Sequence, residues 1–157
     1  MKMTFGSFAT LMILVGLAFP ALRGKQPSVP KFYLAASASL RSPEQVRIRG
    51  VTNLPPGSKL FLEIDDYIGQ GSRILNEEPE VVVDAKGMFD VQVHAKKGLG
   101  FQVNNICSIA FHPSGQNPEI IRLVGRKGEH LGFPENPLAH VGSGEYHYLE
   151  VVIVVTE

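Results

Sequence analysis

Apolar and polar residues alternate with a period of two along most of the chain after residue 45. Val46 and Ile48 alternate with Arg47 and Arg49, and the alternation returns over residues 60–65 and 88–95. Successive side chains of a β-strand point to opposite faces of its sheet, so this period predicts strands with one buried face. The predicted inward rows are Leu60, Leu62 and Ile64; Phe89, Val91 and Val93; and Asn105, Cys107, Ile109 and Phe111.

Turn residues separate these strands at short intervals. In Asn53–Gly57, Pro56 presets φ and Gly57 supplies the positive φ of a type II turn, and Ala85–Gly87 is typical of a hairpin. No helical period interrupts the pattern, so we expect an all-β, antiparallel β-sandwich over residues 46–157, preceded by a linker over residues 25–45. The seven expected strands are residues 46–50, 60–65, 80–84, 88–95, 103–112, 119–124 and 146–155.

The first 24 residues have the order of a secretory signal. Lys2 is followed by an uncharged stretch over residues 3–22, whose apolar centre is Leu11–Phe19, and Pro20 then breaks the helix expected there. Residues 3–22 are also long enough to span a bilayer as an uncleaved anchor. The sequence therefore predicts a secreted or periplasmic protein, or one tethered to the membrane by residues 3–22 alone, and leaves open whether the leader is cleaved.

Charge and cysteine content narrow the function classes. After Gly24 the chain holds 13 basic and 15 acidic residues, a net charge of −2, which does not suit a nucleic-acid partner. Cys107 is the single cysteine, so no intramolecular disulfide can form. Its place in an inward row predicts a small buried side chain. No sequence motif calls for a cofactor.

Three segments resemble a known group of domains. Ile48–Leu60 (IRGVTNLPPGSKL), Val83–Phe89 (VDAKGMF) and Leu123–Leu131 (LVGRKGEHL) are similar to segments of uncharacterised secreted bacterial domains with an immunoglobulin-like or transthyretin-like fold. The resemblance covers roughly residues 46–155. It implies an immunoglobulin-like β-sandwich and implies no activity, because such domains offer no assigned catalytic residues to transfer.

Motifs for catalysis are absent, and one group of residues suits a metal. The sequence has no G-x-S-x-G elbow and no HExxH, so we expect a protein that is not an enzyme. A hydrolase with a site assembled from distant strands remains an alternative. His140, Glu145 and His147 supply two imidazoles and a carboxylate, ligands that Zn²⁺ or Cu²⁺ accept, so a metal-binding periplasmic protein is a second alternative.

Tyrosines and valines near the end of the chain suggest a binding surface. Tyr148, Val152 and Val154 share the outward row of the last strand, and either a second sheet or a partner must cover such a row. Tyr146 and Tyr67 lie near loops, where an apolar ring with a hydroxyl suits recognition. The sequence therefore predicts a non-catalytic module that binds or assembles with an envelope or extracellular protein.

Overall fold

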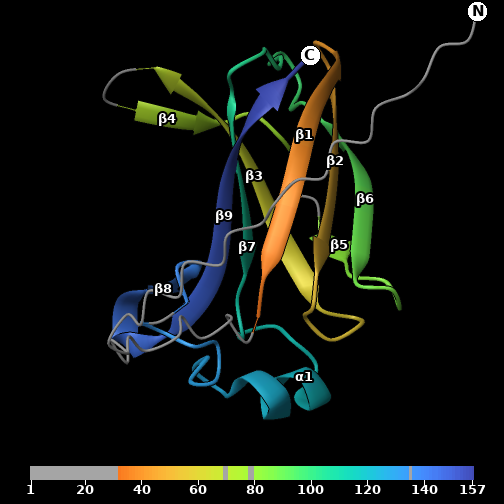
Figure 1. Ribbon diagram of the computed structural model, residues 1–157. Helices are drawn as coiled ribbons and strands as arrows, with labels where there is room; N and C mark the ends of the chain where they lie inside the picture. The colour runs from red at the N-terminus through yellow and green to blue at the C-terminus, as the bar shows by residue number, and fades with distance from the viewer. Residues whose placement is uncertain (1–31, 69–70, 78–79, 135) are drawn as a thin grey trace, which may run out of the picture.

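The computed structural model describes residues 32–157 except 69–70, 78–79 and 135, and shows a single curled β-sheet with one short α-helix (Figure 1). This confirms the all-β class. The predicted leader over residues 1–24 lies outside the described residues. The elements are β1 Leu34–Ser42, β2 Gln45–Thr52, β3 Lys59–Ile68, β4 Gly71–Ile74, β5 Glu80–Val82, β6 Met88–His94, β7 Ile106–Phe111, α1 Pro118–Val124, β8 Ala139–Val141, a 3₁₀ turn Ser143–Glu145 and β9 His147–Thr156.

The strand order is β4-β3-β7-β9-β1-β2-β6, with β5 paired to β3 and β8 paired to β9. The curl places β1, β2 and β6 opposite β3, β7 and β9, and α1 closes one end (Figure 1). The prediction of a strictly antiparallel sheet is wrong for one pair of strands. β1 and β9 run parallel, with Ala38 paired to Val155 and Ser39 paired to Thr156. These two strands come from opposite ends of the described chain, so no local turn dictates their direction.

The expected linker over residues 25–45 is wrong in its second half, because residues 34–42 form β1. Small residues hide the alternation there: Leu34 and Ala38 are buried, whereas Ala35 and Ser37 between them are exposed. Alanine and serine contribute little to a hydrophobic signal, so the pattern of this segment resembles that of a loop. Burial between β9 and β2 holds this stretch in a sheet.

The strand expected over residues 119–124 is also wrong, because this segment is the helix α1. The Asn117 side chain accepts a hydrogen bond from the Ile120 N–H at 3.0 Å, and Pro118 occupies the first turn, where no N–H is needed. Ile120 and Val124, four residues apart, are buried on one face. These local signals outweigh the β-branched residues of the segment.

The inward rows are confirmed for three strands. Leu60, Leu62 and Ile64 of β3 are fully buried, and so are Cys107, Ile109 and Phe111 of β7. On β6, Phe89 and Val93 are buried and Val91 is partly buried. On β9, Leu149 and Val155 are buried and the residues between them on that face are partly buried. The hydrophobic core therefore lies inside the curl, and each strand has its polar or mixed row outside.

The segment Leu75–Glu77 closes the curl on one side. Leu75 N–H donates to Ile64 O of β3 at 2.7 Å, and Glu77 N–H donates to His94 O of β6 at 3.2 Å. Between them the buried Asn76 accepts from Ile64 N–H through its side chain and donates to Leu62 O. This segment thus supplies hydrogen bonds to the edges of both β3 and β6 and joins the two sides of the sheet.

Candidate functional site

The outer face of β3, β7 and β9 carries three rows of side chains that cross the strands. The register aligns Asp65 with Ile106 and Val154, and Glu63 with Ser108 and Val152. A third row aligns Phe61, Ala110 and Glu150. We call these nine residues the acidic face, because three carboxylates stand on it and no basic residue does.

Val152 and Val154 stand on β9, at one side of this face. Their side chains are 58% and 51% exposed, although β9 has neighbouring strands on both sides. Within the described residues, therefore, no second sheet covers Val152 and Val154, and these apolar side chains are exposed to solvent on a central strand. We call Val152 and Val154 the valine ridge.

Four rings, one of which is Phe61 of the acidic face, form a row across the strands, and we call this row the ring row. His112 stacks on Tyr148 with ring centroids 5.0 Å apart, and His140 lies 5.4 Å from Tyr148 on the other side. Phe61 meets His112 edge-on at 5.7 Å. Since His112 and Tyr148 turn their faces toward each other, no open ring face remains between them for a sugar to stack on. The row joins β3, β7, β8 and β9.

Of the remaining tyrosines that the sequence suggests, Tyr146 lies apart from this face. Tyr146 is 44% exposed after the 3₁₀ turn, and its ring lies 5.7 Å from the ammonium of Lys127. Tyr67 pairs with Ser72 near the far end of β3, and its side chain is outside the described part of the structure. Of the five predicted surface residues, the structure thus brings together Tyr148, Val152 and Val154.

The predicted metal ligands do not form a cluster. His140 pairs with Tyr148 and shares its side of the sheet, whereas His147 is the preceding residue on β9 and points to the opposite side, against Phe133. Glu145 is exposed in the loop between β8 and β9. Among the described residues, no group of three or more His, Cys, Asp or Glu side chains could hold a metal ion.

One arrangement on the acidic face has the residue types of a hydrolytic triad. The Ser108 hydroxyl donates a short hydrogen bond to Glu150, and His112 lies two residues beyond Ala110, the residue opposite Glu150. In a triad the imidazole bonds both the hydroxyl and the carboxylate, whereas here the hydroxyl bonds the carboxylate directly. This order does not activate the serine in the usual way.

Burial disfavours the charged forms of two titratable groups near this face, His112 and Cys107. Burial lowers the pKa of His112, and the charge of Glu150 partly opposes that shift. Burial, followed by the charge of Asp65, raises the pKa of the Cys107 thiol to about 12, so the thiol is not a nucleophile near neutral pH. Asp65 has one carboxylate oxygen, Oδ1, that is buried without a hydrogen-bond partner.

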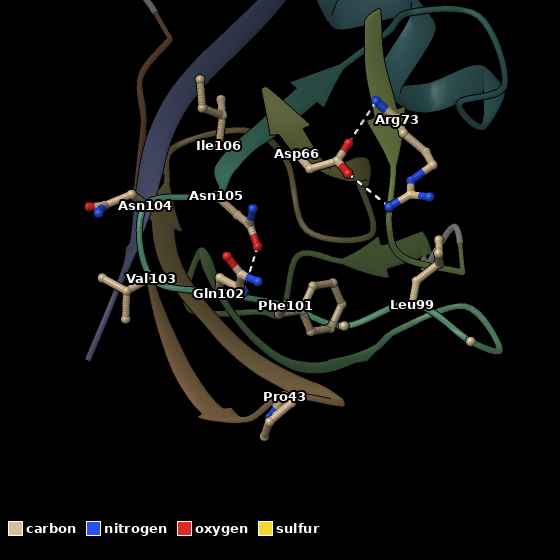
Figure 2. Close-up of a pocket in the computed structure, with 12 residues that line it drawn as sticks. Pro43, Asp66, Arg73, Leu99, Phe101, Gln102, Val103, Asn104, Asn105 and Ile106 are labelled. Atoms are coloured by element: carbon tan, nitrogen blue, oxygen red, sulfur yellow. Dashed lines mark hydrogen bonds and ion pairs between the residues drawn. The ribbon is translucent and has the colours of Figure 1, made fainter. Parts of the chain in front are cut away.

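A separate groove of about 810 Å³ lies beside the paired ends of β3 and β4, where the loop over residues 98–105 passes. Figure 2 shows Arg73 held by Asp66 on one wall, with a guanidinium–carboxylate distance of 3.0 Å, and Asn105 bonded to the Gln102 backbone on another. The polar side chains on these two walls are thus engaged in contacts within the protein.

The carboxylates of the acidic face could not be recognised from the sequence as a group. Glu63 and Glu150 are 87 positions apart, and a carboxylate on the polar side of a strand is ordinarily a solvated residue. Only the pairing of β3 with β7 and of β7 with β9 places them on one surface.

In comparisons with known proteins, no protein-family model, curated protein or solved structure matches the chain. Among the described residues, no helix is both long and apolar enough to cross a membrane.

Proposed function

We propose that this chain is an exported, non-catalytic β-sandwich module of immunoglobulin-like type that works by presenting the acidic face to a protein partner in the cell envelope or outside the cell. The observation that carries the proposal is the exposure of the valine ridge on a central strand. Isolated exposed valines are ordinary, but two valines on the same face of a central strand, two positions apart, form a contiguous apolar strip that a partner can cover.

Two further features support a role in recognition. Glu150 is the outward residue of β9 next to the strip, and Glu63 and Asp65 lie across β7 on β3, so the apolar strip shares its face with three carboxylates, a mixture of apolar and polar area that protein interfaces commonly have. Phe61, which belongs to both the acidic face and the ring row, is 38% exposed and adds apolar area to the same surface. Export itself rests on the leader-like residues 1–24, and in a tethered form residues 3–22 would hold the module at the membrane.

Site-specific photocrosslinking tests the proposal in the full-length protein within the cell envelope. A photoreactive residue in place of Val152 should give discrete crosslinked adducts, because a partner covers that position. The matched control is the same residue in place of Leu123, which is 52% exposed on α1, far from the acidic face. Adducts no more abundant at position 152 than at position 123 would contradict the proposal.

A further inference from the structure

The groove beside the ends of β3 and β4 lies at the end of the curl opposite α1. α1 closes one end, and β4 and the β1–β2 turn stand at the other (Figure 1). The groove volume of about 810 Å³ falls within the range of about 300–1,000 Å³ that small-molecule sites commonly have. The mouths of β-barrels are among the places where such sites occur. Both the size and the position of the groove therefore suit a small ligand.

Asn105 offers an unused hydrogen-bond donor to this groove. The residue is 9% exposed, and its side-chain oxygen accepts a hydrogen bond from the Gln102 N–H at 2.6 Å. That bond determines which branch of the amide carries the oxygen, so the nitrogen occupies the other branch of this groove-lining side chain (Figure 2). Among the described residues this nitrogen has no acceptor. A donor that is buried to this degree without a partner favours a ligand that supplies an oxygen atom.

The position of Asn105 is fixed by the protein itself. Its backbone carbonyl accepts from the Val155 N–H of β9 at 2.9 Å, and the Asn104 N–H donates to the Val155 carbonyl at 2.9 Å. Earlier in the same loop the Phe101 N–H donates to the Pro43 carbonyl, between β1 and β2, at 2.6 Å. A donor held in place in this way loses little conformational entropy when a ligand binds.

The charges that line the groove cancel each other. Among the described residues that line it, Asp66 and Arg73 are the two with ionisable side chains. The Asp66 carboxylate accepts from the backbone N–H of Arg73 and from its guanidinium Nη2, each at 3.0 Å. A guanidinium has five N–H donors, so further donors remain within the described structure beside carboxylate oxygens that can accept more bonds. Hydroxyl groups suit this pair, because they can both accept and donate and bring no charge that needs a partner.

Apolar side chains make up much of the remaining lining. Leu99, Phe101, Val103 and Ile106 stand there. A fitting ligand therefore combines an apolar group with hydroxyls and with an oxygen that only accepts. An N-acetylated sugar has these three features, in the methyl group of its acetamido substituent, its ring hydroxyls and its acetamido carbonyl.

We infer that the groove binds a neutral N-acetylated sugar unit. Asn105 Nδ2 donates to the acetamido carbonyl, apolar side chains such as Leu99 contact the methyl group, and Asp66 and Arg73 bond the ring hydroxyls. This inference goes beyond the proposed function, because it assigns a second site, for a small molecule. The groove shares only Ile106 with the acidic face, so photocrosslinking at position 152 and sugar binding can fail independently.

Titration of the full-length protein with N-acetylglucosamine, in a detergent that contains no sugar, tests the site by nuclear magnetic resonance. The side-chain amide signals of Asn105 and the backbone signals of Gly98 and Gly100 should shift to saturation, because these residues line the groove. Glucose has the same ring without the acetamido group, and its affinity should be lower by about tenfold or more. The absence of saturable shifts with N-acetylglucosamine, or equally tight binding of glucose, would overturn the inference.

Asn105→Asp removes the free donor and keeps the loop hydrogen bond. One carboxylate oxygen still accepts from the Gln102 N–H, whereas the other replaces the nitrogen and repels the acetamido carbonyl, so the affinity for N-acetylglucosamine should fall about tenfold or more. The matched control is Gln92→Glu, the same amide-to-carboxylate change on the exposed side of β6, which keeps the oxygen that accepts from Gln45. It should leave the affinity unchanged. Unchanged affinity in Asn105→Asp, or an equal loss in both variants, would contradict the assignment.

Arg73→Ala is a second variant, at a position where folding tolerates the change. The Arg73 side chain is 61% exposed, and the backbone N–H of residue 73 can still donate to Asp66 in the variant. Loss of the guanidinium donors should weaken the binding of N-acetylglucosamine about threefold or more. Thermal melting shows whether each variant is folded. If Asn105→Asp does not fold, unchanged affinity in Arg73→Ala overturns the inference.

Discussion

At the scale of single residues, the surroundings of His112 decide whether its imidazole carries a charge at the border of the acidic face. Its ring is packed between Phe61 and Tyr148, and Glu150 is the carboxylate whose charge acts on it. Burial favours the neutral imidazole and lowers its pKa, so His112 is uncharged at neutral pH. His112 therefore adds no charge to the border of the acidic face under those conditions.

The lowered pKa of His112 predicts a loss of stability in mild acid. As the pH falls through 6.5, the unfolded chain takes up a proton at this histidine before the folded chain does. The free energy of unfolding should therefore decrease from about pH 7 toward the pKa of the folded state, and this contribution should be absent above pH 7. His112→Phe keeps a ring and should reduce the drop in melting temperature between neutral and acid pH. The exposed His94→Phe is the control, and an equal reduction in that variant would contradict the prediction.

At the scale of elements, local chemistry and tertiary burial decide between helix and strand. Residues 118–124 are apolar and partly β-branched, yet Asn117 and Pro118 at the start and Gly125 at the end produce a helix. Residues 34–42 have weak strand propensity, yet β1 forms because strands on both sides bond to it. Short elements of this kind depend on their caps and neighbours more than on composition.

Replacement of the α1 cap should have a measurable cost. Asn117→Ala removes the acceptor for the Ile120 N–H and should lower the free energy of unfolding by about 1 kcal/mol. Asn117→Asp keeps an acceptor at the same place and should retain most of the stability. Urea denaturation of both variants measures the difference. Equal losses in the two would show that the cap hydrogen bond is not what stabilises this end of the molecule.

At the scale of the whole molecule, the curl is held by contacts between residues distant in sequence. β1 and β9 join its two sides at one place, and Leu75–Glu77 joins them at another. Asn76 is fully buried at the second junction, and its side chain satisfies two backbone groups of β3 that would otherwise lack partners. A buried amide of this kind is costly to lose because the groups it leaves behind remain buried.

Asn76→Leu should therefore destabilise the whole fold. The Ile64 N–H and the Leu62 carbonyl would each lose a partner, at a combined cost of about 3 kcal/mol. The exposed Gln92→Leu, on β6, should change the free energy of unfolding by less than about 0.5 kcal/mol. Urea denaturation is the measurement. A cost for Asn76→Leu as small as that of Gln92→Leu would mean that this junction opens without consequence for the rest of the sheet.

By itself the sequence determined the all-β class and the inward faces of the long strands, because alternation with a period of two directly reflects which side chains leave water. It also placed Tyr148, Val152 and Val154 on one outward row, since residues two apart on a strand share a face. It did not recognise β1 or α1, in which small residues and capping chemistry replace a strong hydrophobic period.

Only the tertiary structure decided which rows become neighbours. His140 and His147 lie close along the chain, but their opposite orientations separate them as metal ligands. Glu63 and Glu150 are far apart along the chain, but β7 lies between their strands and brings them onto one face. A period in the sequence records the side of a strand on which each residue lies. The identity of the adjacent strand depends on long-range pairing, which leaves no local pattern in the sequence.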